Sequence, residues 1–240
     1  MNKLIMTAVL LIMATVTVFG QNEQPAQPAQ QDTETNRKRN ESDRKVYQLA
    51  LRYNDLPAAR IKLLELIERN PTNIQYAETL ASLYFESGQY TSAAIAALDV
   101  LEASDKSLTG LEIAAYSLEQ LGALDRALPN FERHYLLTGN LFSLYKTAYM
   151  QYSLDRHEES LNSINMLVKN NKSSEEKVGF PKEDNTQQEV TLKAAALNLK
   201  GMVYMSQKNK TEAREAISQA LELQPNFELA QENMKEVQKM

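Results

Sequence analysis

The chain contains no cysteine, no tryptophan and only two histidines, His134 and His157, among its 240 residues. The lack of cysteine excludes a disulfide framework, a thiolate nucleophile and a thiolate metal site. Two histidines that form no metal-binding pair leave little imidazole chemistry, and we interpret both as structural side chains. These absences disfavour many classes of enzyme and metalloprotein.

A strong excess of one charge is also missing. The 26 Lys and Arg residues face 31 Asp and Glu residues, which gives a net charge of -5. So weak a field does not gather polyanions, and we expect neither nucleic acid nor an anionic membrane surface as a partner. No glycine-rich phosphate loop precedes a lysine, so no nucleotide or other cofactor is expected. The sequence therefore favours a protein that is not an enzyme.

The N-terminus contains the longest apolar run of the chain. After Lys3, residues 4–19 are uncharged and mostly apolar, and Gly20 then precedes the polar Gln21. This layout predicts a signal peptide over residues 1–20 that is cleaved near Gly20, and a periplasmic or otherwise secreted product without stable membrane insertion. The alternative is an uncleaved anchor, but a membrane-spanning helix needs about 18 or more apolar residues, and threonines dilute this run.

Residues 21–41 are rich in Gln, Asn and Pro and contain no large apolar side chain. Such a segment has nothing to bury, so it predicts a disordered polar linker. We interpret its basic cluster, Arg37–Arg39, as solvated charge. The folded domain is expected to follow, over residues 42–240, where 43% overall hydrophobic content is enough to build a core.

Small residues recur in two columns along this domain. The first column has steps of 34, 33 and 53 residues, the last being one repeat plus a 19-residue insertion. The second column lies twelve residues after the first, across a polar turn. The two columns consist of Ala81, Ala115, Ala148 and Gly201, and of Ala93, Ala127, Ser160 and Ala213. Apolar residues around both columns recur every three to four positions, which predicts helices and no strand.

The pattern resembles the tetratricopeptide repeat family, here in a secreted or periplasmic setting. The resemblance is carried most fully by Leu197, Gly201, Tyr204, Ala213, Ile217, Ala220 and Pro225, and nearly as well by Leu80, Ala81, Tyr84, Gly88, Tyr90, Ala93 and Ala97. It implies an all-α fold, a right-handed α-solenoid of about five helix-turn-helix units with a C-terminal capping helix. The units are expected at 42–73, 74–107, 108–140, 141–173 and 194–227, with an insertion at 172–190 and the capping helix at 227–240.

In this family the first helices of the units line a concave groove that binds peptides. The residues expected to face that groove recur at i, i+4 and i+7, and are acidic in the early units and aromatic or Met-rich in the later ones. They are Glu78, Phe85, Glu112, Tyr116, Glu119, Tyr145, Tyr149, Tyr152, Met202 and Met205. Exposed Tyr and Met side chains are typical of adaptable binding surfaces. The alternative is a rotated helix whose tyrosines pack against a neighbour.

Relatives that clamp a C-terminal carboxylate use inner Lys and Asn side chains. At the corresponding places this chain has Glu78, Ser82, Glu112 and Tyr116, which favours a basic or apolar peptide segment instead. The resemblance thus predicts a non-catalytic interaction scaffold of the cell envelope that holds a protein segment in its groove. The alternative is a structural assembly subunit that associates through the solenoid ends or convex face, and an enzyme is a third reading.

The insertion at 172–190 is mostly polar but contains an apolar patch, Val178–Pro181. Thr186 and Glu189 have the spacing of a capping box, which predicts that helix resumes there and leaves the patch in a flexible loop. We hypothesise that Phe180 docks reversibly near Tyr149, Tyr152 or Met202 and shields the groove. The alternative is a disordered loop with one isolated Phe.

Overall fold

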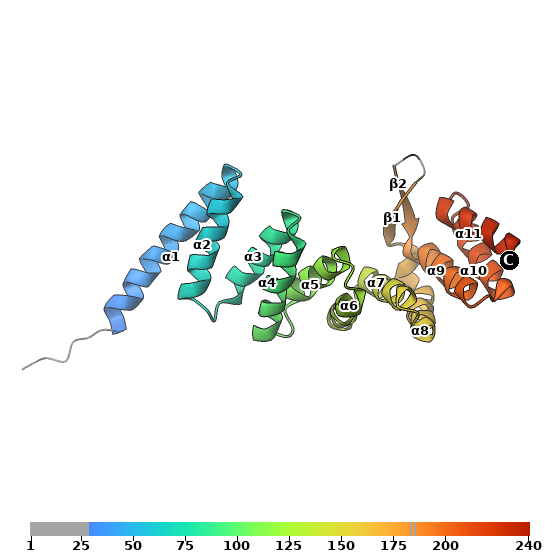
Figure 1. The fold of residues 1–240 in the computed structure, drawn as a ribbon, viewed down its shortest axis with the longest axis horizontal. Coiled ribbons are helices and arrows are strands. Elements are labelled where there is room, and N and C mark those ends of the chain that lie inside the picture. The colour runs from blue at the N-terminus through green and yellow to red at the C-terminus, as the bar shows by residue number, and fades with distance from the viewer. Residues whose placement is uncertain (1–28, 183, 185) are drawn as a thin grey trace, which may run out of the picture. The chain divides into compact units, whose positions relative to one another are not determined.

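The computed structural model describes residues 29–182, 184 and 186–240 (Figure 1). The predicted signal peptide and the first part of the predicted linker lie outside the described residues. The chain divides into two units, residues 1–39 and 40–240. Among the described residues, no helix combines the length and apolar character needed to cross a membrane.

Helix α1 (Ala29–Arg52) corrects the prediction of a disordered linker up to residue 41. Residues 33–39 expose their side chains, so this part of α1 is helical without burying anything. Propagation of an existing helix costs far less than nucleation, and an i,i+4 pair between Glu34 and Lys38 adds local support at 3.1 Å. The prediction failed because it assumed that a segment without apolar residues stays disordered. An existing helix can extend into such a segment without burying any side chain.

Within residues 40–240, helices from α2 onward follow one another in helix-turn-helix pairs, and each packs on the next (Figure 1). This arrangement confirms the predicted all-α repeat fold. The helices are α2 (Leu56–Arg69), α3 (Ile74–Glu86), α4 (Tyr90–Ala103), α5 (Leu108–Gln120), α6 (Leu124–Thr138), α7 (Leu141–Ser153), α8 (His157–Lys169), α9 (Leu192–Ser206), α10 (Lys210–Leu223) and α11 (Glu228–Lys239).

The turns inside all five units share one backbone geometry. The residue at the second position of each turn has a left-handed φ of 55 to 73°, and the residues concerned are Asn54, Gly88, Gly122, Asp155 and Lys208. The next N–H then bonds back across the turn to a carbonyl of the last helical turn, as Gln89 does to Tyr84 at 2.9 Å and Asn209 to Tyr204 at 2.8 Å. This is the Schellman arrangement, which satisfies carbonyl groups that the helix end leaves free. It sets the second helix of each unit back against the first.

The two columns of small residues lie where the paired helices cross. Ala81, Ala115, Ala127 and Ala213 are fully buried. Ser160 is fully buried as well, and its hydroxyl donates to the carbonyl of Ala148 at 2.8 Å. A polar residue is tolerated in this column because its hydroxyl is satisfied within the crossing.

The insertion forms a short 3-10 helix (Asn171–Ser174) and an antiparallel hairpin of β1 (Lys177–Pro181) and β2 (Gln187–Thr191). The hairpin contradicts the prediction that no strand follows Asn40. The capping-box prediction is also wrong, because Thr186 lies in the hairpin turn, where its N–H donates to Asp184 Oδ1 at 2.9 Å. Helix α9 begins after Thr191, whose hydroxyl accepts from the N–H of Ala194 at 3.3 Å.

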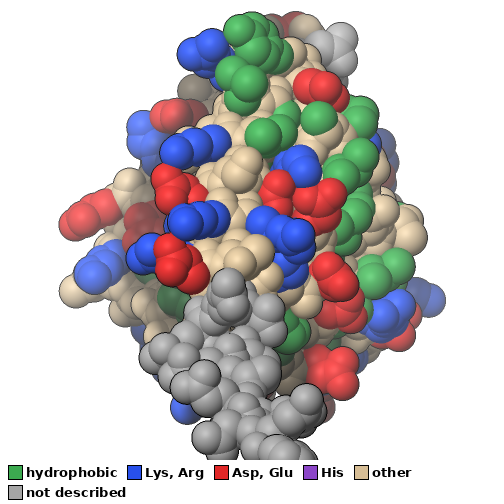
Figure 2. All heavy atoms as spheres, turned by 90° about the vertical axis from the view of Figure 1, so that its left-hand side faces the viewer, with side chains coloured by type: hydrophobic (Ala, Val, Ile, Leu, Met, Phe, Trp, Pro, Cys, Tyr) green, Lys and Arg blue, Asp and Glu red, His purple; other side chains and the backbone are tan. Residues whose placement is uncertain are grey.

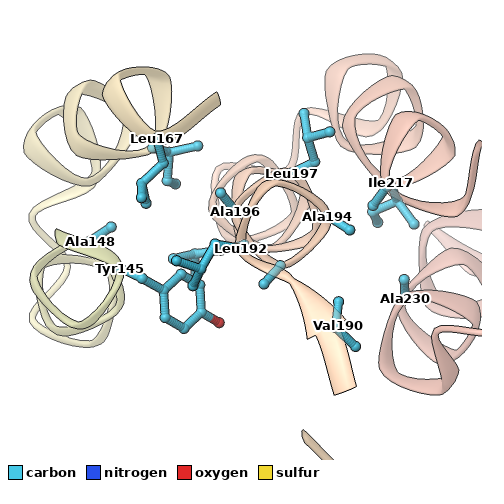
Figure 3. Close-up of a cluster of buried hydrophobic side chains, with 14 of the residues drawn as sticks. Tyr145, Ala148, Leu167, Val190, Leu192, Ala194, Ala196, Leu197, Ile217 and Ala230 are labelled. Carbon is cyan, nitrogen blue, oxygen red and sulfur yellow. The ribbon is translucent and has the colours of Figure 1, made fainter. Parts of the chain in front are cut away.

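The hairpin belongs to the hydrophobic core. Val190 of β2 is fully buried and lies with Ala194 of α9 and Ala230 of α11 (Figure 3). The same apolar cluster runs from Leu141 to Val237, so it joins the last two units, the hairpin and the capping helix. The remaining apolar clusters among the described residues are smaller and lie between neighbouring helices.

Candidate functional site

Three hollows lie along the face formed by the first helices of the units, and we call this face the groove. The N-terminal hollow has a volume of about 590 Å³ and lies between α1 and α3. The middle hollow, of about 470 Å³, lies between α3 and α5 and shares Ser82, Glu86 and Thr109 with the first. The C-terminal hollow, of about 530 Å³, is bounded by α7, β1, α9 and α11. Helix α5 joins the last two hollows, since Glu112 and Tyr116 line one and Glu119 the other.

The groove is acidic. Glu78, Glu86, Glu112 and Glu119 line the three hollows, and Lys146 is the single cationic side chain among their described lining residues. Lys146 Nζ donates to both carboxylate oxygens of Glu119, at 2.7 and 3.0 Å, so its charge is already compensated. The Glu78 carboxylate accepts from the Ser107 hydroxyl at 2.6 Å, which holds it against α5. A basic side chain therefore finds more carboxylate partners here than an acidic one finds cations.

Aromatic rings lie along the same face. Phe85 and Tyr116 lie in the middle hollow with ring centroids 6.3 Å apart, and Tyr116 also contacts Phe131 edge-on at 5.0 Å. Burial raises the pKa of the Tyr116 phenol, and the carboxylates of Glu112 and Glu119 raise it further. Tyr116 is thus a neutral hydrogen-bonding group across the physiological pH range.

The tyrosines of α7 differ in exposure. Tyr145 lies in the C-terminal hollow but is only 8% exposed, and its ring points into the large apolar cluster (Figure 3). Tyr149 lines the same hollow and is 40% exposed. Tyr152 is partly buried and lines none of the three hollows. Burial raises the pKa of its phenol, and the neighbouring Tyr149 raises this pKa further. The structure therefore divides these residues between packing and access, where the sequence predicted that all three face the groove.

Of the other predicted residues, Glu78, Phe85, Glu112, Glu119 and Met202 line the hollows. Met205 lines none of the three hollows and packs on the edge of the large apolar cluster. The hollows also contain side chains that the sequence analysis missed, chiefly Phe142, Lys146 and Leu229. The one sequence signal for Lys146 is that it directly follows Tyr145 of the predicted groove stripe.

Phe180 packs against two rings that the sequence analysis did not name as its partners. Its ring lies 6.4 Å from that of Tyr145 and 5.0 Å from that of Phe227, measured between centroids. Pairing in the hairpin directs Val178 and Phe180 to one side of β1, toward the large apolar cluster. Phe180 is therefore a wall of the C-terminal hollow, which Tyr149 and Met202 also line, and its ring contacts are with Tyr145 and Phe227.

The histidines have structural contacts. His134 Nδ1 lies 2.8 Å from Ser143 Oγ of the next unit, and His157 Nε2 lies 3.3 Å from Ser206 Oγ. Among the described residues, no three His, Asp or Glu side chains are placed to hold a metal ion together.

Comparison with known proteins agrees with this architecture. Residues 194–227 match the tetratricopeptide repeat family, over the same range as the fifth predicted unit. YrrB, a tetratricopeptide repeat protein with an unusual peptide-binding site, has a similar fold, with a TM-score of 0.66 at 16% identity over 88% of this chain and 100% of YrrB. No curated protein matches the sequence significantly.

Two further solved structures share the fold. MamA from Desulfovibrio magneticus has a TM-score of 0.58 at 13% identity, over 79% of this chain and 97% of MamA. A tetratricopeptide repeat protein from Parabacteroides merdae has a TM-score of 0.50 at 15% identity, over 84% of this chain and 99% of the other. This chain therefore contains one matched tetratricopeptide repeat and has the fold of solved tetratricopeptide repeat proteins.

Proposed function

We propose that this protein is a non-catalytic interaction scaffold that holds a basic and apolar segment of a protein partner in the groove. The observation that carries the proposal is the charge balance of the groove, with four glutamates against one lysine that is already paired with Glu119. A bound segment would place Lys or Arg side chains over α3 and α5 and apolar side chains in the C-terminal hollow. Complementary charge sets which partner is accepted and how fast it arrives.

Peptide binding by YrrB supports this proposal through fold alone, because the two sequences are only 16% identical. The chemistry of the groove must therefore decide the ligand class. A clamped C-terminal carboxylate would need free cations, and Lys146 is engaged by Glu119 at 2.7 Å. We therefore favour an internal basic segment over a terminal carboxylate.

The proposal is tested with random linear peptides displayed on phage and selected on the purified chain. The selected peptides should be enriched in Lys, Arg and apolar residues, and their affinity should fall as salt is added. Replacing Glu86 and Glu112 together by Lys should weaken binding at least about tenfold. Asp99→Lys combined with Glu102→Lys is a matched control, because both acids are exposed on α4 and line none of the three hollows.

Two results would reject this function. One is a set of selected peptides enriched in Asp and Glu or dependent on a free C-terminus. The other is binding that survives the Glu86 and Glu112 reversals unchanged.

A second candidate is an assembly subunit, and one observation favours it. Val46 and Leu49 of α1 are 39 and 46% exposed, and Tyr53 in the turn that follows is 68% exposed. Ile61 and Leu64 of α2 are 55 and 49% exposed. Figure 2 faces the end of the molecule that carries these helices and shows hydrophobic side chains beside a column of basic and acidic ones. Stable oligomers in sedimentation velocity that dissociate when Leu49 and Tyr53 are replaced by Ser would favour this candidate.

We further propose that the scaffold works in the cell envelope. The support is the apolar run over residues 4–19 between Lys3 and Gly20, which has the layout of a cleaved signal.

A further inference from the structure

The hairpin has two edges, and hydrogen bonding identifies which backbone groups face each. In the antiparallel register Lys177 opposes Thr191 and Phe180 opposes Gln188. Just beyond the paired strands, the N–H of Lys182 donates to the carbonyl of Thr186 at 2.9 Å. Because bonded and non-bonded pairs alternate, the even-numbered residues of β1 bond to β2. The backbone groups of Lys177 and Gly179, with the carbonyl of Pro181, therefore point away from β2.

The outer edge of β2 is closed by one side chain. The Gln224 amide donates to the carbonyl of Glu189 at 2.7 Å and accepts from the N–H of Thr191 at 3.3 Å. These are two consecutive outward-facing groups of β2. The Gln224 amide thus occupies the place that a peptide group of a third strand would take.

The outer edge of β1 has no such cover. The outward groups of Lys177 and Gly179 make no hydrogen bond within the described part of the chain. This edge borders the C-terminal hollow, which Gly179 and Pro181 line together with Tyr149 and Met202. Unpaired strand groups beside an apolar hollow offer both main-chain and side-chain contacts to an extended peptide.

The edge is also held rigidly, so pairing with it needs little reorganisation. Gln188 bonds through its side-chain amide to the carbonyl of Asn226 and the N–H of Glu228. Lys182 forms an ion pair with Glu228 at 3.3 Å. With Val190 buried in the core, these contacts fix the hairpin to the capping helix. Preorganisation of this kind reduces the entropy cost of binding.

We propose that the partner segment adds to the hairpin as a third strand on the edge of β1. The inference rests on the proposed function and specifies how the C-terminal hollow is used. The occupant is an extended stretch of a protein partner with apolar side chains at alternate positions, because one face of the added strand lies on the apolar side of β1 and the other on solvent. It has no proline at the paired positions, since each must supply an N–H.

The first test scans a linear peptide that has been selected from the random library and whose binding is lost in the chain with Glu86 and Glu112 reversed. Each backbone nitrogen of the peptide is methylated in turn, and affinity for the purified full chain is measured. Strand pairing predicts a period of two, with a loss of about tenfold or more at alternate positions and little change between them. This scan needs no variant of the protein.

The second test changes the protein edge. Gly179→Pro removes an outward N–H without removing a bond to β2, so it should weaken peptide binding about tenfold. Gly179→Ala is the matched control, because it keeps the N–H and its Cβ would meet only the flexible end of Gln187, at 3.0 Å. Equal melting temperatures of the two variants check that the hairpin remains folded.

The outcomes separate this inference from the proposed function. Peptides that bind the groove but show no two-residue period, and bind Gly179→Pro as well as Gly179→Ala, would overturn strand addition and leave the scaffold function standing. If no selected peptide depends on the groove glutamates, both proposals are wrong.

Discussion

Gly201 of α9 touches Ile217 of α10 so closely that a Cβ atom at residue 201 would lie 2.3 Å from Ile217 Cγ1. Alanine normally stabilises a helix interior over glycine by about 1 kcal/mol. Here the contact reverses that preference, and Gly201→Ala should lower the free energy of unfolding by about 1 to 3 kcal/mol. Urea denaturation followed by circular dichroism measures the change.

A double-mutant cycle identifies the cause. Ile217→Ala alone destabilises by leaving a cavity, but combined with Gly201→Ala it removes the clash, so the two losses should be less than additive. Additive losses would mean that the helices do not cross at this point.

The ion pairs of Asp43 should make the stability of the first unit depend on pH. Burial alone would raise its pKa, but hydrogen bonds and charge from Lys62, at 3.0 Å, and from Arg69 outweigh burial and lower the pKa below its ordinary value. A lowered carboxylate pKa stabilises the fold above the unfolded value of about 4, and this contribution is lost as pH falls toward the folded pKa. Asp43→Asn should cost about 1 kcal/mol or more at pH 7, because Lys62 and Arg69 lose their anionic partner.

The pH dependence separates this role from simple packing. The stability difference between Asp43→Asn and the parent should shrink as pH is lowered from 5 to 2, because the parent loses its charge. Hydrogen exchange of α1 and α2 amides checks where the effect lies, and a difference independent of pH would contradict the ion-pair role.

Tyr145 and Tyr149 should respond differently to truncation. Tyr145 is 8% exposed, so Tyr145→Ala should destabilise the fold by about 3 kcal/mol. Tyr149 is 40% exposed beside the C-terminal hollow, so Tyr149→Ala should change stability by less than about 1 kcal/mol yet weaken a groove-binding peptide about tenfold. Calorimetry of binding and thermal melting distinguish the two. Equal effects on stability would show that Tyr149 is also a packing residue.

The proposed envelope location predicts that the N-terminus of the protein is cleaved. Expressed from Met1 in a bacterial host, the protein should be recovered in the periplasmic fraction with an N-terminus at or near Gln21 if residues 1–20 are a cleaved signal. N-terminal sequencing checks the processing site. Intact Met1 in the membrane fraction would favour the uncleaved anchor.

The repeat fold was predictable because its signal is redundant. Small residues such as Ala81, Ala115 and Ala127 recur in register, and each helix crossing requires them for the same steric reason. The turn positions follow the same steps, so even Asp155 and Lys208, which replace glycine there, have the left-handed φ. The helical periodicity and the repeated columns of small and turn residues agree, so the architecture can be predicted from one sequence.

The hairpin and the exposure of the tyrosines were not predictable in this way. Val178, Phe180 and Val190 form a strand pattern only when the two strands are paired, and a polar turn separates them along the chain. Periodicity places Tyr145 and Tyr149 on one helix face, but it cannot show that Phe180 and the core cover the first and leave the second open. The sequence alone therefore could not separate the packing residues of the predicted groove stripe from the accessible ones.

The apolar cluster that joins Leu141 to Val237 has a mechanical consequence. Helices α2 to α6 pack mainly on their neighbours, whereas α7 to α11 share one core with Val190 of the hairpin. If the chain is pulled from its two ends in optical tweezers, the early units should peel off in small steps, and the last two units with the hairpin should then rupture together. The C-terminal end of the groove would thus keep its form under a load that unravels the acidic end.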